Sequence, residues 1–134
     1  MNFTILAFDF GTKCIGCSVG QSITKTSSPL AAQKVKSKDT FPLIDQHIKE
    51  WKPKYLVVGL PLNSSGDNLL GKSYNRFLDY LRRTGVEVIL INEYLTTKEA
   101  REYLFDKYGY RGLKKDKIDS ISACLIAESW FNNI

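Results

Sequence analysis

The fold of this chain is indicated first by residues 3–20, which read FTILAFDFGTKCIGCSVG. The segment opens with a nearly continuous apolar run that ends at Asp9, and such a run predicts a strand buried on both faces. A turn over residues 11–13 and the small apolar residues 14–19 predict a second strand that returns antiparallel. Residues 29–35 could form a third strand, so the chain is expected to open as a meander.

The pattern then changes to alternating helices and strands. Three strands followed by helix, strand, helix, strand and helix predict an α/β fold with a mixed five-stranded sheet flanked by helices, in one domain over residues 1–134. Sites in such sheets form at the carboxyl ends of parallel strands, here after Asp9, Gly59 and residues 86–91. Four helices are expected: 41–51, closed by Pro53; one around 74–81, ended by Gly85; one capped by Thr96 or Thr97; and 118–131. The strands between them are expected at 55–58 and 86–91. Loops are expected at 59–68 and 107–114.

Composition narrows the class of protein. The chain has 134 residues, of which 43% are hydrophobic, as expected for one globular domain. It lacks the apolar run of about 18 residues that a membrane span needs, and its start does not resemble an export signal. Three cysteines argue against a disulfide scaffold and favour a reducing cytoplasm.

The positive charge is concentrated in two segments. The chain carries 19 basic and 14 acidic residues, yet residues 10–38 contain five lysines and no acid. Residues 101–117 contain six bases and three acids. Two basic segments on an otherwise neutral chain favour a polyanion such as nucleic acid as partner, although a solvated basic surface is the simpler alternative.

Three carboxylates stand where a catalytic metal site would form. Asp9 follows the first buried run, Glu93 follows the run Val88 to Ile91, and Asp119 precedes the last helix. Each has a structural alternative, because Asp9 could cap a turn, Glu93 could pair with a helix cap and Asp119 could favour a helix N-terminus. Three acids on one edge beside basic loops are suited to bind two Mg²⁺ ions, so we favour the metal interpretation.

Residues 66–73, GDNLLGKS, match the phosphate-binding pattern G-x-x-x-x-G-K-[ST]. The context is unfavourable, because residues 59–65 intervene between the preceding strand and the first glycine. Leu69 and Leu70 also stand where a phosphate needs small neighbours. An ATPase is therefore the weaker interpretation.

Other reactive and aromatic side chains are expected to be structural. Cys14 and Cys17 lie three apart on a predicted strand and face opposite sides, so one zinc ion cannot bind both. His47, the only histidine, is expected to be solvated or packed. Cys124, Trp51, Trp130 and Phe131 are expected in the core, whereas Tyr108 and Tyr110 beside Arg111 are candidates for base stacking.

Four blocks of the sequence resemble the YqgF family, also called RuvX, whose members are related to Holliday-junction resolvases. The blocks are ILAFDFGTKCIG at 5–16, VVGLPLN at 57–63, NEYLTT at 92–97 with Glu99-Ala100, and DSISA at 119–123. They occur in the family's order with compatible spacing, from about residue 4 to residue 131.

The resemblance implies a ribonuclease-H-like fold and a cytoplasmic, metal-dependent nuclease. Such a protein would process the 5′ end of pre-16S rRNA, and junction resolution is the older suggestion for the family. Carried over by position, Asp9, Glu93 and Asp119 would be the catalytic acids and would hold Mg²⁺ or Mn²⁺. The family usually has Asp and Arg where this chain has Asn92 and Tyr94. This difference puts the reaction rate and substrate binding in doubt more than the metal site.

The expected partner is pre-rRNA or branched DNA, with the ribosome as a further candidate, and the chain would act as a monomer or homodimer. A four-way-junction resolvase would need a two-fold dimer, and a non-cleaving RNA-binding assembly factor would need no metal. We expect nucleic acid to contact Lys13, Asn63, Arg111, Lys114, Lys115 and Lys117.

Overall fold

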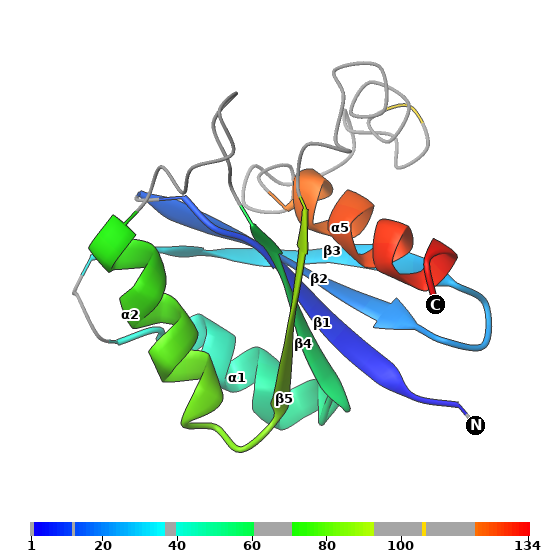
Figure 1. Cartoon of the computed structure of the whole chain (residues 1–134), viewed down its shortest axis with the longest axis horizontal. Coiled ribbons are helices and arrows are strands. Elements are labelled where there is room, and N and C mark those ends of the chain that lie inside the picture. The colour runs from blue at the N-terminus through cyan, green and yellow to red at the C-terminus, as the bar shows by residue number, and fades with distance from the viewer. Residues whose placement is uncertain (1, 12, 37–39, 61–70, 93–105, 107–119) are drawn as a thin grey trace.

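The computed structural model describes residues 2–11, 13–36, 40–60, 71–92, 106 and 120–134. In this part of the chain one sheet has the strand order β3-β2-β1-β4-β5. The first three strands are antiparallel neighbours, and β4 and β5 run parallel to β1 (Figure 1). The predicted mixed five-stranded sheet is confirmed. The strands are β1 (Thr4–Asp9), β2 (Cys14–Gln21), β3 (Thr26–Lys34), β4 (Tyr55–Leu60) and β5 (Glu87–Asn92).

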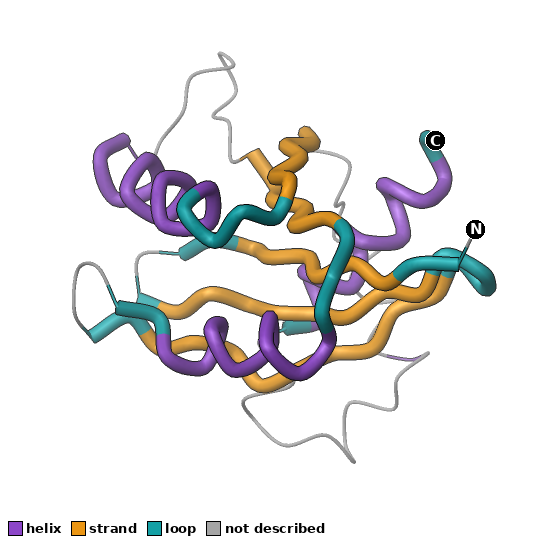
Figure 2. Tube along the Cα trace, turned by 90° about the horizontal axis from the view of Figure 1, so that it is seen from below, coloured by secondary structure: helices purple, strands orange, loops and turns teal. Residues whose placement is uncertain are grey.

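Helices cover both faces of the sheet. Helices α1 (Pro42–Trp51) and α2 (Gly71–Arg82) lie together on one face, and α5 (Ile121–Asn132) lies on the other (Figure 1). Figure 2, seen from below, shows the two chain ends on one side of the molecule. There the rings of Phe3 and Trp130 lie 6.2 Å apart between centroids. No described helix is long and apolar enough to cross a membrane.

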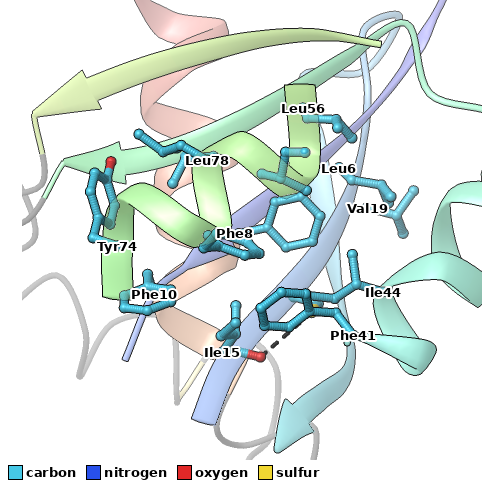
Figure 3. Close-up of a cluster of buried hydrophobic side chains, with 14 residues drawn as sticks. Leu6, Phe8, Phe10, Ile15, Val19, Phe41, Ile44, Leu56, Tyr74 and Leu78 are labelled. Carbon is cyan, nitrogen blue, oxygen red and sulfur yellow. Dashed lines mark hydrogen bonds between the residues drawn. The ribbon is translucent and has the colours of Figure 1, made fainter. Parts of the chain in front are cut away.

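Alternation along β1 divides the interior into two apolar clusters. Leu6 and Phe8 face α1 and α2 within the larger cluster, part of which Figure 3 shows. Ile5 and Ala7 face α5 within the second cluster. All four side chains are fully buried, which explains the nearly unbroken apolar run at the start of the chain.

Strand β2 continues to Gln21 and β5 spans Glu87–Asn92, so both differ slightly from the predicted limits, and β3 and β4 differ in more informative ways. Strand β3 begins at Thr26, and Pro29 lies inside it rather than at its start. The sheet tolerates this proline because β3 is an edge strand, where a backbone nitrogen facing away from β2 needs no partner. Strand β4 continues to Leu60, so the expected loop start at Gly59 is wrong, because Gly59 pairs with Ile91 of β5.

Helices α1 and α2 end close to the proline and glycine that were predicted to end them. Helix α1 ends at Trp51 and is followed by Lys52 in the left-handed conformation, at φ 45°, directly before Pro53. Gly85 follows α2 at φ 85°, a conformation that favours glycine. The helix expected after Thr96 or Thr97, the loop 107–114 and the start of the last helix at residue 118 lie outside the described residues.

Candidate active site

Asp9 is the last residue of β1, and its side chain is half-buried. The chain turns back immediately after it, so that β1 and β2 form an antiparallel pair with Asp9 opposite Gly16. Gly11 is required in this turn, because a Cβ at that position would stand 2.7 Å from the carbonyl oxygen of Cys14. The tight return therefore holds Asp9 at the end of a fully packed central strand.

Three strand ends meet at the edge of the sheet that carries Asp9. Strands β1, β4 and β5 are parallel neighbours, with Phe8 paired to Val58 and Leu60 paired to Asn92. Their carboxyl ends consequently lie side by side. This confirms that the strand ends expected to carry the site lie along one edge.

The backbone alternation assigns Asp9 to the face that α5 covers. Alternate residues of a strand face the same side of the sheet, so Asp9 faces the side of Ile5 and Ala7, which pack against α5. Its cross-strand partner, Gly16, has no side chain. Residue 16 therefore adds no side chain of its own beside the Asp9 carboxylate.

The start of α5 is fixed to the same region of the sheet by Ser120. The backbone N–H of Cys17 donates to Ser120 Oγ at 2.9 Å, and the Ser120 hydroxyl donates to the carbonyl oxygen of Leu30 at 2.6 Å. Cys17 pairs with Phe8, the residue before Asp9. The first turn of α5 thus lies one strand away from the end of β1.

Of the three expected catalytic acids, only Asp9 belongs to the described part of the chain. Glu93 directly follows the last residue of β5 and Asp119 directly precedes Ser120, but both lie outside the described residues. Within the described residues no group of three or more His, Cys, Asp or Glu forms a metal site. Among the expected nucleic-acid contacts, Lys13 is described and exposed, whereas Asn63, Arg111, Lys114, Lys115 and Lys117 lie outside.

The side chains expected to be structural occupy core positions. His47 is buried on α1, with Nε2 2.9 Å from the carbonyl oxygen of Ala31. Burial raises the pKa of the Cys17 thiol well above its usual range, and Cys17 belongs to the α1–α2 cluster. Trp51, Trp130, Phe131 and Cys124 also pack as expected. Tyr108 and Tyr110 lie outside the described residues.

The phosphate-binding pattern at 66–73 is separated in sequence from the described strand β4. Strand β4 ends at Leu60, so residues 61–65 separate it from Gly66. Helix α2 begins at Gly71, and both Lys72 and Ser73 are exposed on it. This separation in sequence does not favour an ATPase, whose phosphate-binding loop leaves a strand at its first glycine.

Ser120 is the residue whose role the sequence alone did not reveal. Ser120 and Ala123 are both fully buried, and their small side chains let the start of the helix lie close to the sheet. The bridge formed by the Ser120 hydroxyl between two strands was not expected. A serine next to an acid at the start of an apolar helix is the only signal for it in the sequence.

Solved structures of low sequence identity share this fold. The Fowlpox virus Holliday junction resolvase aligns with a TM-score of 0.62 and 15% identity, covering 98% of this chain and 99% of that one. RuvC of T. thermophilus, solved with a Holliday junction substrate, aligns with a TM-score of 0.58 and 15% identity over 98% and 94% of the two chains. The fold is that of the ribonuclease-H-like class.

Sequence comparison identifies the family within this class. Residues 3–133 match the RuvX family, described as Holliday junction resolvase. A protein of Histophilus somni (strain 2336) named "Putative pre-16S rRNA nuclease" is 53% identical over 138 residues, covering 99% of this chain and 96% of the relative. A protein of the same name from Haemophilus ducreyi (strain 35000HP / ATCC 700724) is 54% identical over 138 residues, covering 99% of each chain. This chain belongs to the RuvX family.

Proposed function

We propose that this chain is a cytoplasmic, single-domain nuclease that hydrolyses phosphodiesters in structured RNA and processes the 5′ end of pre-16S rRNA. Membership of the RuvX family and the name shared by its relatives support this substrate. The structural observation that carries the proposal is the position of Asp9. It ends a buried parallel strand on the face of α5, one strand from the point where α5 begins.

The second and third acids are proposed from their positions in the sequence. Glu93 has the same parity as Ile89 and Ile91, which pack on the α5 side of the sheet. Asp119 is joined by one peptide bond to Ser120, whose hydroxyl is bonded to β2 and β3. These neighbours favour a common site for Asp9, Glu93 and Asp119.

The chemistry of these side chains fits divalent cations. Carboxylate oxygens are the ligands that Mg²⁺ and Mn²⁺ prefer, and Gly16, opposite Asp9, adds no side chain of its own beside that carboxylate. Asp9, Glu93 and Asp119 would hold the cations. When bound, such ions activate a water molecule and stabilise the charge on the leaving oxygen.

The other residues would bind and orient the RNA backbone. Lys13 is exposed two residues after Gly11 in the turn that follows Asp9, so its ammonium group can neutralise a phosphate near the proposed site. We propose that the same RNA strand is contacted by Asn63, Arg111, Lys114, Lys115 and Lys117. The positive charge of the four basic residues would favour a polyanion and align it at the edge formed by the carboxyl ends of β1, β4 and β5.

Resolution of four-way DNA junctions is the second candidate function. The observation that favours it is the fold shared with the Fowlpox virus and T. thermophilus proteins. A resolvase would have to act as a homodimer, because it cuts two strands. We place this candidate second because the relatives that share 53% and 54% of their residues with this chain are named as pre-16S rRNA nucleases.

Purified protein should be incubated with a pre-16S leader RNA and, separately, with a four-way DNA junction. Each reaction is run with Mg²⁺, with Mn²⁺ and with a chelator, and mass is measured with and without each substrate. Metal-dependent cleavage of the leader by the monomer would support the proposal. Paired cuts in the junction by a dimer would favour the resolvase, and equal RNA binding without cleavage in all conditions would favour a non-catalytic assembly factor.

A further inference from the structure

We propose that Ser120 is a positioning residue for the metal centre, because its hydroxyl fixes the start of α5 to the sheet beside Asp9. This inference rests on the proposed function. Ser120 is not one of the proposed cation ligands, and its role would be to position them. It also predicts an effect on metal binding that is separable from the effect on folding.

The hydroxyl of Ser120 takes the place of a hydrogen bond within the sheet. Cys17 and Leu30 are opposite one another in the β2–β3 pair, and the register shifts between Ile15 and Cys17. At this irregularity the Cys17 N–H and the Leu30 carbonyl both bond to Ser120 Oγ, at 2.9 and 2.6 Å. Ser120 is fully buried, so water cannot easily replace either bond.

The bridge fixes the position of Ser120 relative to the sheet. One hydroxyl bonded to two strands fixes the Ser120 side chain in two directions. Asp119 is attached to it by a single peptide bond. Cys17, which this anchor holds, lies opposite Phe8, about 5 Å or one strand spacing from the strand that ends in Asp9, and the Ser120 oxygen lies beyond it between β2 and β3.

A second serine provides a matched control. Ser18 Oγ donates to the carbonyl oxygen of Ala123 at 2.8 Å, and Ser18 is also fully buried. This bond attaches α5 to β2 as well, but it acts on the helix three residues further from Asp119. Ser18→Ala should therefore loosen the same helix without releasing Ser120, which caps its N-terminus.

The experiment compares wild-type protein, Ser120→Ala and Ser18→Ala by calorimetric titration with Mn²⁺ and by urea unfolding without metal. Both variants should lower the unfolding midpoint to a similar degree. Ser120→Ala should weaken Mn²⁺ binding roughly tenfold or more, as removal of groups that orient ligands commonly does, whereas Ser18→Ala should change it less than about twofold. The Mn²⁺ concentration for half-maximal cleavage should rise in the same ratio.

Equal Mn²⁺ affinity in all three proteins, or equal weakening in both variants, would overturn the inference and leave Ser120 with a structural role only. Ser120→Cys, which keeps a weak donor in a side chain of similar shape, replaces Ser120→Ala if that variant does not fold. It should show a smaller shift in the same direction. Wild-type protein that binds no Mn²⁺ would contradict the proposed function itself, and this inference with it.

Discussion

Gly20 of β2 lies against the ring of Phe131 of α5 so closely that a Cβ on Gly20 would stand 2.8 Å from Cε2 of that ring. The same Cβ would lie 3.0 Å from Cγ1 of Ile5 in the neighbouring strand. Both neighbours are buried, so neither can move aside into solvent. The absence of a side chain at position 20 therefore allows α5 to pack directly on the sheet.

We expect Gly20→Ala to lower the free energy of unfolding by about 1–3 kcal/mol, as overpacking of a dense core does. Urea denaturation measures the change. The double variant Gly20→Ala/Phe131→Leu should lose less than the sum of the two single losses, because the smaller side chain leaves room for the new methyl group. Strict additivity would show that the two residues do not limit one another.

The free energy of unfolding should decline above about pH 8.5 in part because of Cys17. Burial raises the pKa of this thiol in the folded protein, so the folded state keeps the proton while the unfolded state releases it. The stability due to this difference is full below the unfolded pKa of about 8.5 and is lost as pH rises toward the folded value. Cys17→Ala should decline less steeply over the same range, and parallel curves would contradict this assignment.

Affinity for nucleic acid should fall steeply with salt. Each phosphate contact on a duplex contributes about −0.9 to the slope of log K against log salt. Roughly four contacts would then reduce affinity by about two orders of magnitude for a fourfold rise in salt. Fluorescence anisotropy with labelled RNA measures the slope, and an affinity that does not respond to salt would remove the backbone-binding role of the basic segments.

Lys72→Ala should leave cleavage nearly unchanged, and the wild-type protein should not bind ATP. Strand β4 ends at Leu60, five residues of sequence separate it from Gly66, and a phosphate-binding loop is expected to leave its strand at the first glycine. Isothermal titration with ATP and Mg²⁺ checks the expectation. An ATP affinity that Lys72→Ala abolishes would instead support the ATPase.

The order and type of the strands could be predicted because the apolar runs are distinct. The run that ends at Asp9 is buried on both faces, and the breaks at Gly11, Pro53 and Gly85 fall where the chain turns. Strand limits near Pro29 and Gly59 were wrong. Proline and glycine usually interrupt strands, but an edge position accommodates Pro29 and pairing with β5 retains Gly59.

Less of the candidate site could be predicted from the local sequence pattern. Asp9 could be assigned to the end of a strand from the local pattern, since strand and acid are adjacent in sequence. The bond from Ser120 to Cys17 joins residues 103 positions apart. Such a contact depends on a register irregularity between β2 and β3, and no local periodicity encodes it.

The most direct test of the proposed nuclease is the rate at which wild-type protein and Asp9→Asn cleave a pre-16S leader RNA in Mg²⁺. Asparagine keeps the shape of the side chain but removes the charge that a divalent cation needs. We expect a loss of roughly 10³-fold or more, equivalent to about 4 kcal/mol of transition-state stabilisation. The variant should remain folded and still bind the RNA. Asp79→Asn, with the same charge change at an exposed position on α2, should cleave like the wild type.

Two results would contradict this account. An Asp9→Asn variant that cleaves the leader at the wild-type rate would show that Asp9 takes no part in the reaction. A variant that unfolds in the absence of metal would show that Asp9 has a structural role and that the metal site has been assigned to the wrong residues. The predicted result is an inactive, folded, RNA-binding protein beside a fully active Asp79→Asn control.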